Sequence, residues 1–110
     1  MQKPHSYKLN ILVKKRREFY MLATNISNAA IEEIFQEQND TFVTVSYMTG
    51  FKTRQTVRLV VSPRTIILNT NGIPVPATAL RIGMTINASI SSAMTRSIPP
   101  QTTAFEIQIL

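Results

Sequence analysis

The strongest constraint on the fold is the alternation of apolar and polar residues in the second half of the chain. Ile86, Ala88 and Ile90 alternate with polar residues, and the same pattern returns over residues 105–109. A period of two is typical of a β-strand with one face in the core and the other in water. The pattern therefore predicts an all-β domain, and it does not by itself indicate any chemistry.

Turn signals divide the rest of the chain into further short strands. The strongest is Asn71-Gly72, because both residues accept a positive φ, and Ile73–Val75 would be a short return strand at an edge. A chain of 110 residues is one domain on length alone. Short strands at this spacing predict a small five- to six-stranded barrel, which leaves few open edges. The other predicted strands are 41–48, 53–61, 65–69 and 102–110.

Residues 28–37 fit either a helix or a strand. Ile31, Ile34 and Phe35 lie at i, i+3 and i+4, which suits one face of a helix. A strand with a β-bulge would instead place Ile31 and Phe35 on the same face. The residues alone leave both interpretations open.

The inward positions of the predicted strands give an expected core. Burial of side chains such as these contributes about 1.5–3 kcal/mol each. The expected core residues are Ile31, Val43, Val45, Val57, Leu59, Val61, Ile66, Leu68, Leu80, Ile86, Ala88, Ile90, Phe105, Ile107 and Ile109.

The net charge of +6 belongs to the amino-terminal segment. Residues 1–17 carry six basic residues and no acid, whereas residues 18–110 carry six of each. We therefore expect residues 1–18 to be a mobile basic arm and residues 19–110 to form the barrel domain. The apolar run 11–13 is too short for a signal peptide and precedes its basic cluster, so a cytoplasmic location is expected. No run approaches the roughly 20 apolar residues of a membrane span.

The residues offer little for catalysis or metal binding. The chain has no cysteine and one histidine, His5, so a four-ligand zinc site and a cysteine nucleophile are excluded. Glu32 and Glu33 are adjacent, and on a regular strand they would point to opposite faces and could not form a catalytic pair. We expect a protein that is not an enzyme and that uses no cofactor.

The spacing of turns and strands resembles a family of small bacterial OB-like β-barrel domains of unknown function. The resemblance covers residues 28–110 and implies that residues 29–36 form a strand. It implies no functional residues. The elements that carry it are Ile31-Glu32-Glu33-Ile34, a valine-rich strand from Val57, Thr65-Ile66-Ile67, Asn71-Gly72, Leu80, Gly83 with Ile86, and Ala104-Phe105-Glu106-Ile107.

The sequence supports two functional hypotheses. The first is a binding or assembly module whose partner is a protein or a second copy, with the edge near Ile73–Val75 available for pairing. The alternative is single-stranded nucleic-acid binding, because OB-like barrels combine basic grooves with aromatic side chains. The candidate nucleic-acid or anion contacts are Lys14, Lys15, Arg16, Arg17, Lys52, Arg54, Arg58 and Arg96.

Tyr47 and Phe51 lie near Lys52 and are candidates for base stacking, whereas Phe105 is expected in the core and Phe42 is a further candidate for it. The serines and threonines around Arg96 form either an anion site or an ordinary polar loop. The surrounding segment, residues 94–101, is distinctive, but the sequence assigns no mechanism to it.

Overall fold

The computed structural model describes residues 23–50 and 52–110. The predicted arm, residues 1–18, lies outside the described residues, and so do Lys14, Lys15, Arg16 and Arg17. Among the described residues, no helix is long and apolar enough to cross a membrane.

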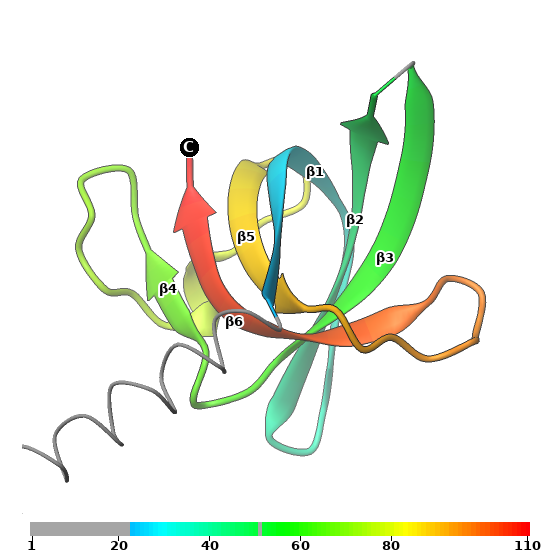
Figure 1. Ribbon diagram of the computed structural model, residues 1–110. Coiled ribbons are helices and arrows are strands. Elements are labelled where there is room, and N and C mark those ends of the chain that lie inside the picture. The colour runs from blue at the N-terminus through cyan, green and yellow to red at the C-terminus, as the bar shows by residue number, and fades with distance from the viewer. Residues whose placement is uncertain (1–22, 51) are drawn as a thin grey trace, which may run out of the picture.

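The described chain is all-β, as the alternation predicts (Figure 1). Residues 28–37 belong to a strand, which decides the open question of helix or strand. The strands are β1 (Ala23–Glu37), β2 (Asp40–Thr49), β3 (Thr53–Val61), β4 (Ile66–Leu68), β5 (Thr85–Ser91) and β6 (Gln101–Ile109), with one 3-10 turn, η1 (Ala77–Ala79), before β5.

Five of the strands close into a barrel. Neighbouring strands follow the order β3-β2-β1-β5-β6, and β3 pairs with β6 to complete the circle. That last pairing is parallel, whereas the other four are antiparallel. β4 is an extra strand, parallel to β6, outside this circle. The predicted OB-like barrel is therefore confirmed as a closed five-stranded mixed barrel with one added strand.

β1 is the strand shared between the two halves of the barrel. Its first half pairs with β5 over Ala23–Ala30, and its second half pairs with β2 over Ala30–Glu37. Each half contains a β-bulge, between Ile26 and Ala29 and between Ile31 and Glu33. A bulge inserts one unpaired residue and bends the strand, which lets one long strand serve both halves of a small barrel.

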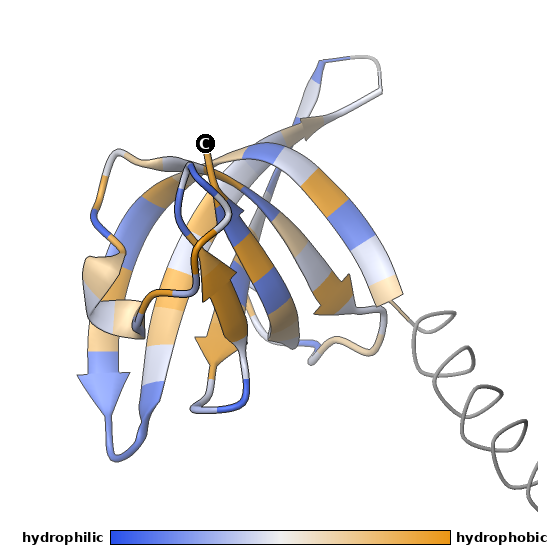
Figure 2. Cartoon of the chain, turned by 90° about the vertical axis from the view of Figure 1, so that its left-hand side faces the viewer, coloured by the Kyte–Doolittle hydropathy of each residue, from blue (hydrophilic) through white to orange (hydrophobic). Residues whose placement is uncertain are grey.

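The core is built from the inward positions of the strands, which Figure 2 shows as apolar bands alternating with polar ones. Twelve of the fifteen expected core residues are buried; the exceptions are Ile66, Leu68 and Phe105. The predictions for β3 and β5, which follow strict alternation, are confirmed throughout. The core also contains four residues that were not expected there, namely Ile26, Ala29, Ile67 and Ala104.

The three wrong core assignments have local causes. In β4 the inward residue is Ile67, whereas Ile66 is 52% exposed. The sequence could not predict this, because a run of three apolar residues contains no alternation to show which residue points inward. In β6 a bulge lies opposite Ser89 and Ile90, whose partners are Glu106 and Ala104. Phe105 is the extra residue, and it leaves the core.

The bulge of β1 between Ile31 and Glu33 explains why another expectation is wrong. Ile34 packs against the core, and Phe35, which was expected to share a face with Ile31, points outward and is 41% exposed.

The predicted hairpin at Asn71-Gly72 is present, with Gly72 at φ 77°. The side chain of Asn69 accepts hydrogen bonds from the backbone N–H groups of Asn71 and Ile73 at 2.9 and 3.0 Å. The return segment is held by an isolated bridge from Pro74 to Leu68 and by the Val75 N–H, which donates to Ile67 O. The expected edge therefore exists, but Pro74 cannot donate from it.

The inward and outward registers of β5 predict opposite effects for neighbouring substitutions. Ile86 is fully buried and Thr85 is exposed. We expect Ile86→Asp to abolish the cooperative thermal transition seen by circular dichroism, because it buries an unpaired charge. Thr85→Asp should change stability by no more than about 0.5 kcal/mol. Equal tolerance of the two substitutions would contradict the register.

Candidate ligand-binding face

The outward side chains of β1, β2 and β3 form one continuous surface on the barrel. We call this surface the arginine face. Its members are Glu32, Glu33 and Phe35 from β1, Phe42, Thr44 and Ser46 from β2, and Arg54, Thr56, Arg58 and Val60 from β3.

Two phenylalanines and an arginine form the centre of the arginine face. The rings of Phe35 and Phe42 are stacked, with their centroids 5.0 Å apart and their planes 9° from parallel. The guanidinium carbon of Arg58 lies 5.4 Å from the centroid of the Phe35 ring. This is the geometry of a cation–π contact, which adds to the stacking of the two rings.

The β1–β2 hairpin brings these residues together. Its turn consists of Gln38 and Asn39, so that Phe35 pairs with Phe42. Phe42 in turn pairs with Val60 on β3, and Thr44 pairs with Arg58. The side chain of Arg58 therefore extends across β2 to reach Phe35 on β1, and Thr44, which pairs with Arg58, is only 6% exposed although it points outward.

The bulge between Ile31 and Glu33 places two carboxylates on this face. The expectation that Glu32 and Glu33 point to opposite faces is wrong, because the bulge removes the alternation at this point. Ser46 Oγ donates to Glu32 Oε2 at 2.6 Å, and Thr44 Oγ1 donates to Glu33 Oε1 at 3.4 Å. Both hydroxyls belong to outward residues of β2, so both carboxylates lie on the outer surface.

Ser46 also connects the acidic and basic parts of the face. Arg54 Nη1 donates to Ser46 Oγ at 2.8 Å, so this hydroxyl lies between Arg54 and Glu32. The guanidinium of Arg58 has fewer hydrogen-bond partners. Its Nε is buried, and no described atom accepts a hydrogen bond from it. The guanidinium is thus held by its ring contact rather than by a carboxylate.

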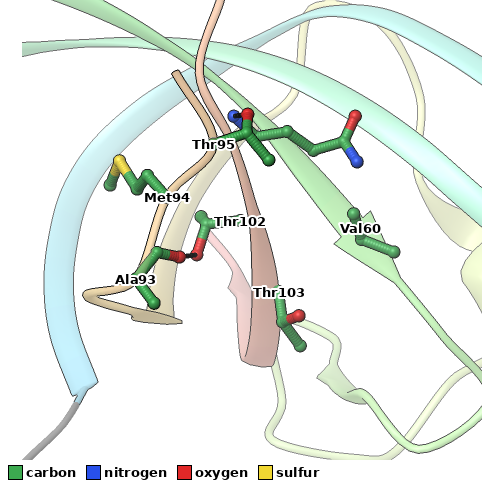
Figure 3. A pocket seen from close by; sticks show the side chains of 7 residues that line it. Val60, Ala93, Met94, Thr95, Thr102 and Thr103 are labelled. Atoms are coloured by element: carbon green, nitrogen blue, oxygen red, sulfur yellow. Dashed lines mark hydrogen bonds between the residues drawn. The ribbon is translucent and has the colours of Figure 1, made fainter. Parts of the chain in front are cut away.

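A shallow pocket of about 320 Å³ adjoins the arginine face at Val60 (Figure 3). Its other wall is the loop between β5 and β6, where Ala93, Met94 and Thr95 lie. Thr102 Oγ1 donates to the backbone oxygens of Ser91 and Ala93 at 2.7 and 2.9 Å, which fixes the base of this loop. Because Val60 pairs with Phe42, the pocket continues the surface that begins at the stacked rings.

The structure brings together some of the predicted contact residues. Arg54 and Arg58 lie on the arginine face, and Lys52 lies at the exposed end of the β2–β3 hairpin that leads to it. That hairpin projects beyond the barrel in Figure 1. Arg96 is exposed in the β5–β6 loop, beyond the wall of the pocket.

The hydroxyl groups around Arg96 stabilise the loop itself. Thr95 Oγ1 accepts a hydrogen bond from Gln101 N at 2.9 Å, and Ser97 Oγ donates to Pro99 O at 2.9 Å. Ser91 Oγ accepts from Ala93 N at 3.1 Å. These contacts favour the interpretation as a polar loop over that as a built anion site.

The aromatic pair was not among the residues predicted to stack on bases. Of the two that were, Tyr47 points inward and packs against the core, and Phe51 lies outside the described residues. Phe42, which the sequence left as a candidate for the core, points outward and stacks on Phe35. The available signal was the turn: a hairpin turn at residues 38 and 39 pairs position 35 with position 42.

A second, larger cavity of about 580 Å³ lies on another side of the barrel. Phe105, Ile66, Arg64 and Glu106 are among the residues that line it. None of the predicted contact residues lies there. The part of the chain that the structure describes contains no group of three or more acidic or histidine side chains able to hold a metal ion.

Comparisons of the chain with protein-family models, with curated proteins and with solved structures gave no match. What is established is therefore the fold: a small all-β protein with a closed five-stranded barrel.

The hydroxyl of Ser46 generates a test of the arginine face. Ser46→Ala removes the link between Glu32 and Arg54 at a site that is only 4% exposed. We expect a loss of about 1 kcal/mol in the free energy of unfolding, measured by urea denaturation. Thr56→Ala, at the exposed residue that pairs with Ser46, is the control and should change stability little. Equal effects would show that the link contributes nothing.

Proposed function

We propose that this protein is a non-enzymatic binding module and that its arginine face binds single-stranded nucleic acid. The observation that carries the proposal is the stacked pair Phe35–Phe42 with Arg58 beside it on an accessible surface. Phe35 is 41% exposed, so part of its ring can be reached by a ligand. Base–aromatic stacking uses this kind of surface and tolerates any base.

The position of the face supports the same ligand. In OB-like barrels the surface of the second and third strands, flanked by the loop after the first strand and the loop between the last two, binds oligonucleotides or oligosaccharides. Here the pocket between Val60 and the β5–β6 loop continues this surface. Arg54, Lys52 and Arg96 would contact phosphates along its borders, since guanidinium and ammonium groups pair readily with them.

The basic residues before residue 18 add to this proposal. Six basic residues without an acid would contribute a non-specific attraction to phosphates that weakens with salt. The arm would then increase affinity, and the arginine face would supply the stacking site. We further propose a cytoplasmic location and membership of the small bacterial OB-like family that the sequence resembles.

A protein partner is the second candidate, and one observation favours it. The β5–β6 loop exposes Ile98 completely and Met94 by 39%, and apolar side chains at a loop tip are suited to contact another protein. Self-pairing along residues 73–75 is less favoured, because Pro74 and Pro76 lack N–H donors.

The proposal is tested by titrating a fluorescent single-stranded oligonucleotide with the full chain at several salt concentrations. Two variants separate the arm from the barrel: one with Lys14, Lys15, Arg16 and Arg17 all changed to Gln, and Phe35→Ala. If only the arm variant loses binding, the barrel is not the site. If the wild-type chain shows no binding, the nucleic-acid proposal is wrong and the protein-partner hypothesis takes its place.

For Phe35→Ala we expect weaker binding by about 1–3 kcal/mol, because one stacking platform is lost. The salt slope should stay unchanged, since no phosphate contact is removed. The matched control is Ile66→Ala, which shortens an exposed apolar side chain on another side of the barrel and should leave Kd unchanged. Equal losses in the two variants would contradict a role for the arginine face.

A further inference from the structure

The carboxylate of Glu33 lies on the same face of the barrel as the stacked rings. Glu33 precedes Phe35 by two positions on β1, and both side chains point outward. Residues two apart on one face of a strand are about 6.6 Å apart along the chain, which is within the width of a stacked nucleobase. A base that stacks on the part of the Phe35 ring left exposed by Phe42 and Arg58 would therefore have one edge close to Glu33.

The described part of the protein holds this carboxylate in place but leaves most of its hydrogen-bond acceptor positions unused. Glu33 Oε1 accepts one hydrogen bond, from Thr44 Oγ1 at 3.4 Å, and Oε2 accepts none from the described residues. Thr44 is itself only 6% exposed, and it pairs with Arg58 on β3. An ionised carboxylate can only accept hydrogen bonds, so it presents free acceptor positions to any ligand.

The two carboxylates restrict the path of a nucleic acid across the face, because a carboxylate repels phosphates. The repulsion excludes the phosphate chain from the side of the face that carries Glu32 and Glu33. The phosphates would run instead along Lys52 and the exposed part of Arg54, whose Nη1 is bound to the Ser46 hydroxyl that contacts Glu32, and the bases would point toward the carboxylates. A carboxylate that meets a base edge favours a donor there, as when Glu accepts from the N4 amino group of cytosine.

We propose that Glu33 makes the arginine face selective for bases with an exocyclic amino group, so that cytosine binds more tightly than uracil. This inference rests on the proposed function. Cytosine presents an amino group at position 4, where uracil presents a carbonyl oxygen that the carboxylate repels. The only ring donor of uracil, N3–H, lies between two carbonyl oxygens, so a carboxylate that approaches it also meets an acceptor.

The test compares two pyrimidine ligands of equal length, oligo(dC) and oligo(dU), against the full chain at neutral pH. The two bases have the same ring size, so stacking on Phe35 differs little between them. We expect oligo(dC) to bind at least about fivefold more tightly, since one good base-edge contact discriminates by this order. In Glu33→Gln the ratio should fall to within about twofold, because the amide can donate to the uracil oxygen as well as accept.

Glu106→Gln is the matched control, because it removes the same charge from an exposed residue of β6 that lines the second cavity. It should keep the wild-type preference. Equal binding of the two oligonucleotides by the wild-type chain would overturn the inference and leave the proposed function standing. A preference that survives Glu33→Gln would also overturn it. Failure of both oligonucleotides to bind the wild-type chain would instead overturn the proposed function.

Discussion

The barrel depends on the double pairing of β1. This one strand of 15 residues hydrogen-bonds to β5 along its first half and to β2 along its second half. A regular strand would run straight and lose its pairing with one of these neighbours. The two bulges supply the bend that closure of the barrel requires. The parallel pairing of β3 with β6, reinforced by the 2.8 Å hydrogen bond from Arg58 N to Pro100 O, completes the circle that β1 begins.

The same irregularity determines the chemistry of the outer surface. Because the second bulge suspends alternation, Glu32 and Glu33 both reach the outside, where Ser46 and Thr44 of β2 bind them. After the bulge, Phe35 points outward opposite Phe42. The backbone feature that helps to close the barrel thus also places Phe35 and two carboxylates on the face to which β3 contributes its arginines.

Periodicity predicts this structure where the strands are regular and fails where they are bulged. Alternation correctly predicted the inward residues Val57, Leu59 and Val61 of β3 and Ile86, Ala88 and Ile90 of β5, and the outward position of Arg58. It failed at Phe35 and Phe105, each of which lies at or just beyond a bulge, because an inserted residue reverses the facing of the residues after it. The aromatic pair could not be found from strand facing alone, since it depends on the pairing across the turn at residues 38 and 39.

The most direct test of the arginine face as a binding site is to map the ligand on the protein by two-dimensional ¹H–¹⁵N NMR of the full chain during titration with oligo(dC). We expect the backbone signals that move most to belong to β1 from Glu32 to Phe35, to β2 from Phe42 to Ser46, and to β3 around Arg58. Signals of β5 and of the second cavity, including Phe105, should stay in place. Perturbations centred on that cavity, or confined to residues 1–18, would contradict the claim that the arginine face is the binding site.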